Sequence, residues 1–467
     1  MYKVPRIVIA ATNSGAGKTT IVSGILAGLT AMGKSVQAYK IGPDYIDPGY
    51  HQLASGKPGH NLDTWLVPQT KINEIFYETA QAIDIAVIEG VMGLYDGGKK
   101  GISSTAAIAK QIEAPVILVI DVKSMGDSAA AIALGFKMYD KSVNFAGVIL
   151  NRVGSSSHEM MIREAMEKIN IPVLGAIYRN EALKMPERHL GLLPVTENDA
   201  KAVMTLIKET IMQQVDLERL YQIAVQAPAL TFKEQNPLAK KPTTIKIGVA
   251  KDEAFSFYYP ESLQILIDQG IELIPFSPLK DKCLPEVSGI IIGGGFPEMF
   301  VKELSANFSM KQSINTAGKA GMPIYAECGG LMYLTTRITD FQEDSYEMVG
   351  LIPARCQMNT KLQTVGYIEA TALRDNILCT NNSIIRGHEF HFSTMCTEND
   401  KDSFPWAFEF EKIRTKTKYK SGYAFNNILA SYLHLHFAGN TALAERFVKQ
   451  CMTFAHTQSQ RGDEVIG

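Results

Sequence analysis

The sequence is poor in cysteine, and its first 282 residues contain none. The six cysteines are scattered between Cys283 and Cys451, and no two are spaced as CxxC. This distribution argues against a disulfide framework and a zinc site, and it favours a cytoplasmic location. No apolar run reaches the roughly 18–20 residues that span a bilayer. The chain opens on a strand pattern, so we expect neither a signal peptide nor a membrane anchor.

An excess of charge of either sign is also missing. The sequence holds 46 Lys and Arg against 48 Asp and Glu, a formal net charge of −2. This balance gives no reason to expect nucleic acid or an anionic membrane as a partner. Hydrophobic residues make up 46% of the 467 residues, enough to build the cores of several domains.

Residues 1 to about 180 alternate short apolar runs with longer amphipathic segments. The runs are continuous, which is typical of strands buried on both faces of a parallel sheet, and the intervening segments suit crossover helices. We therefore predict an N-terminal α/β domain with a doubly wound parallel sheet. Its expected strands are Ile7–Ala11, Val36–Tyr39, Ile85–Glu89, Val116–Ile120, Ala146–Leu150 and Val173–Ala176.

A polar stretch that carries proline and lysine separates this region from a second alternating pattern. We predict domains over residues 1–225 and 245–467, joined by a linker over residues 226–244. Antiparallel strands are expected within residues 340–430. The other predicted elements are strands Ile245–Ala250, Ile271–Pro275, Gly289–Ile292 and Pro323–Ala326, and helices Pro260–Asp268 and Thr441–Thr453.

The stretch Ala11–Thr20 joins the first strand to an amphipathic segment and fits the P-loop pattern, except that Thr12 replaces the first glycine. Its glycines let backbone N–H groups turn towards phosphate oxygens, and the positive end of the next helix adds to that field. Lys18 is expected at the terminal phosphates. The predicted ATP-binding residues are Asn13, Ser14, Gly15, Ala16, Gly17, Lys18, Thr19, Thr20 and Asn151, whose amide either reads adenine or caps a turn.

Charged residues follow two further predicted strands, at the sheet edge where open α/β folds bind ligands. A loop after the second strand carries Lys40, and the strand Ile85–Glu89 ends in one acid, as a Walker-B strand does. Oxygen ligands of this kind suit Mg²⁺. The predicted metal ligands are Thr19, Asp44, Asp47 and Glu89, and the substrate-loop candidates are Tyr45, Ile46 and Asp96.

Cys328 stands between a predicted strand and two glycines that open a helix, the elbow that exposes a nucleophile. A helix N-terminus lowers a thiol pKa, so we expect a thiolate. The predicted oxyanion hole is formed by N–H groups of Gly294, Gly295 and Gly329. His434 and His436 would share one face of a strand, so that one acts as the base and the other supports it.

In this order, six motifs make the chain resemble the cobyrinate a,c-diamide synthase family over nearly its whole length. The resemblance implies an N-terminal domain similar to dethiobiotin synthetase and a C-terminal class I glutamine amidotransferase domain of the cobyrinic-acid type. The motifs are Ser14–Thr20, Lys40–Pro48, Glu89–Gly97, Gly293–Glu298, Ala326–Gly330 and Ser431–Phe437.

The resemblance also implies a reaction, namely amidation of the a and c carboxylates of cobyrinate in cobalamin biosynthesis. ATP and Mg²⁺ would form an acyl phosphate, and ammonia from L-glutamine would displace the phosphate. Cys328 would be the nucleophile, His434 the base and Lys40 a catalytic lysine on the substrate side. Triad amidotransferases carry His-x-Glu, whereas His436 fills the Glu position here, so the group that orients His434 is left open. A homodimer is also left open.

Two alternatives remain. A sister enzyme performs the same chemistry on nickel-sirohydrochlorin, and the pair Tyr45-Ile46 slightly favours cobyrinate. A P-loop regulatory ATPase with an inactive amidotransferase-like module is a second alternative, against which the intact Cys328 and His434 argue. The polar segment Arg386–His391 either reaches a carboxylate-rich substrate or forms a solvated turn.

Overall fold

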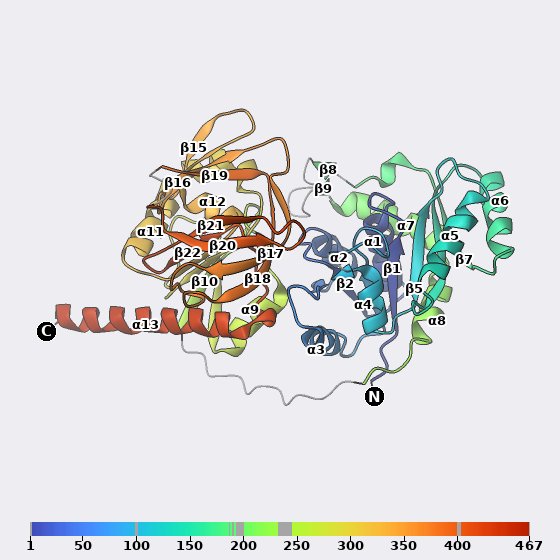
Figure 1. Ribbon diagram of the computed structural model, residues 1–467, viewed down its shortest axis with the longest axis horizontal. Helices are drawn as coiled ribbons and strands as arrows, with labels where there is room; N and C mark the ends of the chain where they lie inside the picture. Colours follow the sequence, from blue (N-terminus) through green and yellow to red (C-terminus); the bar gives the residue numbers. More distant parts are fainter. Residues whose placement is uncertain are drawn as a thin grey trace. The chain divides into compact units, whose positions relative to one another are not determined.

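The structure is a computed structural model that describes residues 2–98, 101–185, 187–188, 191–192, 200–231, 245–398 and 403–466. The chain forms two compact units, Met1–Gln235 and Asn236–Gly467, whose elements are labelled in Figure 1. Residues 232–244 of the predicted linker lie outside the described residues. The residues just before them belong to the N-terminal unit, because the N–H of Tyr2 donates to the carbonyl of Leu230 at 2.9 Å.

The N-terminal unit is built on a parallel sheet of seven strands. These are β1 (Arg6–Ala11), β2 (Val36–Ile41), β3 (His60–Leu62), β4 (Ile85–Glu89), β5 (Val116–Asp121), β6 (Phe145–Val153) and β7 (Val173–Tyr178). Their order in the sheet is β3-β2-β4-β1-β5-β6-β7, so the strand order reverses at β1. The carboxyl end of β1, where the P-loop begins, therefore lies at the switch point where such sheets bind ligands.

Helices cover both faces of this sheet. They are α1 (Lys18–Ala31), α2 (Asp47–Ser55), α3 (Gln69–Thr79), α4 (Thr105–Gln111), α5 (Ser128–Tyr139), α6 (Ser156–Glu167), α7 (Ala200–Gln214) and α8 (Leu217–Val225). Apolar side chains of α1, α7 and α8 join those of the strands in one core. Figure 1 shows α5 and α6 on the side of β5 that faces away from α1. The predicted doubly wound α/β fold is confirmed.

The C-terminal unit has a mixed sheet of nine strands in the order β11-β10-β12-β13-β22-β21-β20-β17-β18. Its parallel part is β10 (Ile245–Ala250), β11 (Ile271–Phe276), β12 (Ile290–Ile292), β13 (Ile324–Glu327) and β22 (Ile428–Ser431). Its antiparallel part continues through β21 (Lys418–Phe425), β20 (Trp406–Lys412), β17 (Thr364–Ala372) and β18 (Ile384–His391). The antiparallel strands expected within residues 340–430 are therefore present.

The remaining elements of this unit surround that sheet. A second sheet contains β14 (Thr335–Thr339), β15 (Ser345–Glu347), β16 (Ile352–Met358) and β19 (Ser393–Thr397). The helices are α9 (Pro260–Asp268), α10 (Val301–Ala306), α11 (Phe308–Lys319), α12 (Gly329–Leu334) and α13 (Thr441–Ile466).

Four elements differ from the prediction. β3 and the two-residue strands β8 (Glu187–Arg188) and β9 (Gly191–Leu192) are too short to give a periodic signal. The helix α13 runs past its predicted end at Thr453, and Phe454, the next residue, still packs on the core.

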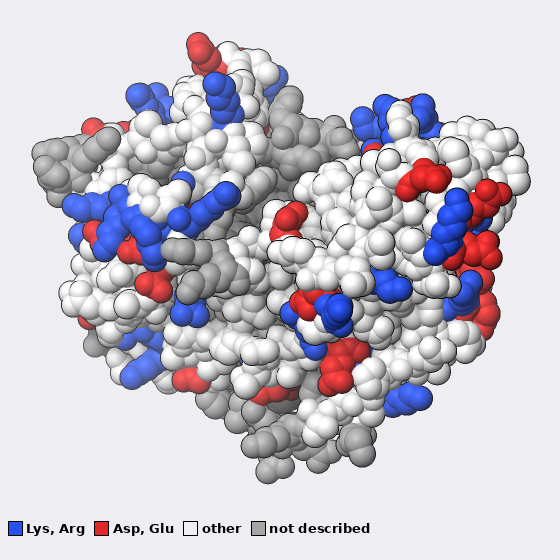
Figure 2. Space-filling view, turned by 45° about the vertical axis from the view of Figure 1, so that its right-hand side comes forward, with Lys and Arg blue, Asp and Glu red and all other residues white. Residues whose placement is uncertain are grey.

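Two further observations concern the surface. Among the described residues, every helix is either too short or too polar to cross a membrane. On the face drawn in Figure 2, the larger groups of basic side chains have acidic side chains beside them.

The packing of α1 against α7 yields a stability prediction. At Gly24 an added Cβ would lie 2.3 Å from Cγ1 of Ile211, so Gly24→Ala should lower the free energy of unfolding by ~1–3 kcal/mol. Gly135→Ala in α5 is the matched control, because a Cβ there meets nothing within 4 Å and the gain in helix propensity is ~1 kcal/mol. Urea unfolding followed by circular dichroism measures both. Equal midpoints for the two variants would contradict this packing.

Candidate active sites

The P-loop is held at the switch point by its own glycines and by Asn151 at the end of β6. Gly17 has φ +91°, and a Cβ there would lie 2.4 Å from Nδ2 of Asn151. That Nδ2 donates to the carbonyl of Ala16 at 2.8 Å. Asn151 therefore contacts the P-loop, beside which the nucleotide is predicted to bind. Asn13, Ser14 and Gly15 are exposed at the tip of the loop.

The side chain of Lys18 folds back across the loop. Its Nζ donates to the carbonyl of Met92 at 2.6 Å, in the glycine-rich loop that follows β4. Burial lowers the pKa of Lys18 to about 8. The two loops that the sequence analysis assigns to one site are therefore in direct contact.

Lys40 and Glu89 face each other because β2 and β4 pair in the register that sets these two residues opposite one another. Nζ of Lys40 lies 2.9 Å from Oε1 of Glu89 and forms a second ion pair with Asp47, the first residue of α2. The hydroxyl of Thr19 donates to Oε1 of Glu89 at 2.7 Å and lies 3.3 Å from Oδ2 of Asp47. Three of the four predicted metal ligands thus converge around one buried ammonium group. We call Thr19, Lys40, Asp47 and Glu89 the carboxylate cluster.

The electrostatics of the carboxylate cluster follow from its burial. Burial opposes charge on Lys40, but Asp47 and Glu89 outweigh it and hold its pKa above the ordinary value. Burial also opposes charge on Glu89, whose pKa is nevertheless lowered by Lys40 and by a hydrogen bond from His51. Burial raises the pKa of Asp47. Glu89 is thus kept ionised by Lys40 and His51, whereas burial favours the neutral form of Asp47.

The fit to Mg²⁺ can be judged from this donor set. Mg²⁺ in phosphate-bearing sites takes one or two carboxylates, with the remaining positions filled by phosphate and water. The hydroxyl of Thr19 and the carboxylates of Asp47 and Glu89 match that set. Among the described residues no group of three or more His, Cys, Asp and Glu side chains is placed to hold a metal.

Two other predicted residues of the N-terminal unit, Asp44 and Asp96, accept hydrogen bonds from backbone N–H groups of their own loops. Oδ1 of Asp44 accepts the N–H groups of Ile46 at 2.8 Å and Asp47 at 3.2 Å, and Asp96 accepts the N–H of Gly93 at 3.1 Å. Tyr45 and Ile46 are half-buried. Asp44 is separated from Nζ of Lys40 by 4.0 Å, so it borders the carboxylate cluster without joining it.

His51 was missed by the sequence analysis. Its Nε2 lies 2.6 Å from Oε2 of Glu89, and both side chains are fully buried. His51 follows Asp47 by four residues on α2, so both point from one face of the helix towards Glu89. That i,i+4 spacing is the signal that could have found it.

The C-terminal unit contains the expected elbow. Cys328 has φ +46° between β13 and α12, a left-handed conformation that is strained for cysteine. Its N–H donates to the carbonyl of Ser431 at 2.7 Å, which ties the elbow to the end of β22. Sγ lies 3.9 Å from the carbonyl of Phe390 in β18. The strand-to-helix turn predicted from the sequence is thus present.

His434 reaches the same place three residues after β22 ends. Its Nδ1 lies 3.3 Å from Oε2 of Glu327, the residue before Cys328. A Cβ at Gly294 would lie 2.6 Å from Cε1 of His434, and one at Gly329 would lie 3.2 Å from N of Gly295. The structure therefore brings the predicted base and the predicted oxyanion-hole glycines around the elbow.

The thiol itself differs from expectation. Burial, together with the charges of Glu298 and Glu327, raises the pKa of Cys328, although Cys328 directly precedes the helix α12. The prediction of a thiolate is therefore wrong, because the raised pKa favours the neutral thiol in the free protein. α12 spans only Gly329–Leu334, and the field of so short a helix does not outweigh two carboxylates in a buried site.

Sequence comparisons bear on both halves. A CobQ/CobB/MinD/ParA nucleotide binding domain matches residues 7–193, and a CobB/CobQ-like glutamine amidotransferase domain matches residues 246–442. A cobyrinate a,c-diamide synthase of Dehalococcoides mccartyi is 46% identical over 95% of this chain and 98% of that protein. The chain belongs to the cobyrinate a,c-diamide synthase family.

Other relatives agree. Cobyrinate a,c-diamide synthases of Caldanaerobacter subterraneus subsp. tengcongensis and Priestia megaterium are 43% and 40% identical, each over 96% of this chain and over 98% and 97% of those proteins. The chain is thus a ligase of the glutamine amidotransferase type, in a family of cobalamin biosynthesis, with a nucleotide-binding P-loop domain. Family membership decides against the alternative of a regulatory ATPase.

The structure also locates His436 and the segment Arg386–His391. His436 stacks on Tyr259 with ring centroids 4.6 Å apart and lies 3.5 Å from a carboxylate oxygen of Glu261. Residues 386–391 form the end of the edge strand β18, whose His388 stacks on His434 at 4.9 Å. The interpretation of this segment as a solvated turn is therefore wrong, because His388 and Glu389 are buried.

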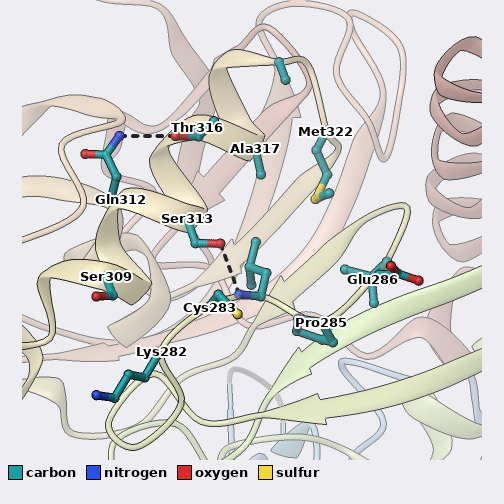
Figure 3. Close-up of a pocket in the computed structure, with 13 residues that line it drawn as sticks. Lys282, Cys283, Pro285, Glu286, Ser309, Gln312, Ser313, Thr316, Ala317 and Met322 are labelled. Carbon is teal, nitrogen blue, oxygen red and sulfur yellow. Dashed lines mark hydrogen bonds between the residues drawn. The ribbon is translucent and has the colours of Figure 1, made fainter. Parts of the chain in front are cut away.

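A surface groove in this unit, drawn in Figure 3, lies between residues 282–287 and α11 and has a volume of about 650 Å³. Oγ of Ser313 accepts the N–H of Leu284 across it at 3.1 Å. None of the residues predicted to act in either half-reaction lines this groove. The groove has no part in the predicted chemistry.

The raised thiol pKa gives a pH prediction. Iodoacetamide reacts with the thiolate, so alkylation of Cys328 in the free protein should keep rising up to about pH 9, above the ordinary thiol pKa of ~8.5. Glu298→Gln removes a charge that raises this pKa, so more thiolate forms at pH 8 and alkylation should be ~3–10-fold faster.

The measurement is mass spectrometry of the peptide that carries Cys328. Glu303→Gln, which removes an exposed carboxylate in α10, is the matched control and should leave the rate unchanged. A plateau in the alkylation rate below pH 7 would show that the thiolate is already formed and that the raised pKa is wrong.

Proposed function

We propose that this chain converts cobyrinate to cobyrinate a,c-diamide, with ATP as the activating co-substrate and L-glutamine as the nitrogen donor. The observation that carries the proposal is the elbow at Cys328 with His434 held by the adjacent Glu327, in a chain at least 40% identical over about 95% of its length to synthases of that name. The same observation supports the named roles of Cys328 and His434.

In the glutamine half-reaction Sγ of Cys328 attacks the side-chain amide carbon. The thiol proton passes to Nε2 of His434 and then to the departing nitrogen, which leaves as ammonia. Backbone N–H groups of Gly294, Gly295 and Gly329 face the oxyanion that forms in between. Water then attacks the thioester carbon while His434 takes a proton from it, the C–S bond breaks, the proton returns to Sγ, and glutamate leaves.

In the other half-reaction a carboxylate oxygen of the macrocycle attacks the γ-phosphorus of ATP, and ADP leaves. Backbone N–H groups from Asn13 to Thr20 hold the phosphates, and Lys18 and Lys40 stabilise the charge of the transferring group. We assign Mg²⁺ to the hydroxyl of Thr19 and the carboxylates of Asp47 and Glu89, where it would neutralise charge on the phosphates. Ammonia attacks the acyl carbon, phosphate leaves, and the amide loses its extra proton to the phosphate.

Asn151 is proposed to contact the adenine, because its amide already lies at the P-loop. Tyr45 and Ile46 are proposed to face the macrocycle from the loop that precedes α2. Asp44, predicted as a metal ligand, and Asp96, predicted in the substrate loop, are proposed to fix the loops around them, because both accept backbone N–H groups there. We propose domains over residues 1–231 and 245–467, which moves the predicted end of the first domain from residue 225 because Leu230 pairs with Tyr2.

Separate half-sites predict separable activities. Cys328→Ala should abolish glutamine-supported synthesis, since no thioester can form, and should keep synthesis from added ammonium chloride within about 3-fold of wild type. Lys18→Ala should lower both by ~100-fold or more, because it weakens phosphoryl transfer itself. Product formation measured by chromatography checks both variants. Full glutamine-supported activity in Cys328→Ala would show that the nucleophile is misassigned.

The macrocycle is tested by supplying cobyrinate and nickel-sirohydrochlorin separately with glutamine, ATP and Mg²⁺. We expect diamide from cobyrinate at a kcat/KM at least ~10-fold above that for the nickel compound, a difference of ~1.4 kcal/mol in transition-state binding. Mass spectrometry follows the addition of one and then two amide groups. Turnover of the nickel compound alone would favour the sister activity.

A further inference from the structure

Glu327 occupies the position next to the predicted nucleophile, yet its side chain belongs to the histidine. The residue is 7% exposed, and its Oε2 lies 3.3 Å from Nδ1 of His434. β13 and β22 pair with Glu327 opposite Ser431, and this register carries the chain on to His434. The contact is thus built by strand pairing, although 107 residues separate the partners.

The second oxygen of Glu327 fixes the carboxylate. Oε1 accepts the N–H of Leu435 at 3.1 Å and a hydrogen bond from the hydroxyl of Tyr325. Burial and the charge of Glu327 raise the pKa of Tyr325, so that hydroxyl stays neutral and donates. A carboxylate held by two donors besides the imidazole has little freedom to turn away from it.

The other histidine of the motif is engaged elsewhere. His436 lies beside Glu261 and against the ring of Tyr259, and its Nδ1 accepts the N–H of Ala438 at 3.3 Å. Glu327, in contrast, places a carboxylate oxygen 3.3 Å from Nδ1 of His434. In a His-x-Glu motif, a glutamate two residues after the base would lie beside the histidine. Here Glu327, from the strand β13, lies beside His434.

We propose that Glu327 is the positioning residue of a Cys–His–Glu arrangement in which the carboxylate comes from the strand of the nucleophile. The proposal rests on the glutamine half-reaction proposed for this chain. Glu327 accepts the Nδ1–H of His434, so that Nε2 carries the lone pair that takes the thiol proton. It then faces the imidazolium while the Sγ–carbon bond forms, and it keeps its own charge throughout. The proton leaves with ammonia.

The test compares Glu327→Gln with Glu261→Gln in the full chain. The substitution at Glu327 keeps the shape of the side chain but removes the charge that stabilises the imidazolium. Glutamine-supported kcat should fall ~30–300-fold with KM for glutamine within ~3-fold, because the interaction matters in the transition state and not in substrate binding. Synthesis from ammonium chloride should stay within ~3-fold. Glu261→Gln, the same change beside His436, should leave kcat within ~3-fold.

A structural role for Glu327 predicts a different pattern. Loss of ammonium-supported and glutamine-supported synthesis together, with a lower unfolding midpoint, would overturn the proposal. So would equal effects of the two substitutions, or an unchanged kcat in Glu327→Gln. A wild-type chain that releases no glutamate from glutamine, even with ATP and cobyrinate present, would overturn the proposed function first.

Discussion

The ammonium group of Lys40, lying between the buried carboxylates of Asp47 and Glu89, is the interaction on which the N-terminal site depends. Removing a partner from a buried ion pair costs ~3–5 kcal/mol, because the remaining charge has neither water nor a counter-charge. Two carboxylates can stay ionised here only while a cation is near. If Mg²⁺ binds here as proposed, it would share with Lys40 the role of counter-charge to these carboxylates.

The C-terminal unit also has a buried carboxylate next to a basic side chain, in this case an imidazole. Glu327 is a buried carboxylate too, and its partners are neutral donors and the imidazole of His434. In the glutamine half-reaction proposed for this chain, the imidazole would become positive when it takes the thiol proton, and the carboxylate of Glu327 would stabilise that charge. Burial and the charges of Glu298 and Glu327 raise the pKa of Cys328, which favours the neutral thiol in the free protein.

The sequence could predict those features that local spacing determines. Continuous apolar runs located the six longer strands of the first sheet, and glycines next to Lys18 and Cys328 located both turns. Contacts that depend on strand pairing and register could not be predicted from the sequence. Glu327 meets His434 because β13 pairs with β22, and Lys40 meets Glu89 because β2 pairs with β4. Neither distance follows from the separation of these residues along the chain.

The thiol pKa shows the limit of a motif more sharply. A helix N-terminus was expected to favour the thiolate, and the elbow is present. The sign of the pKa shift, however, is decided by burial and by Glu298 and Glu327, which the fold places near Sγ. A motif fixes the backbone at a nucleophile, whereas its protonation depends on charges from the whole surrounding fold.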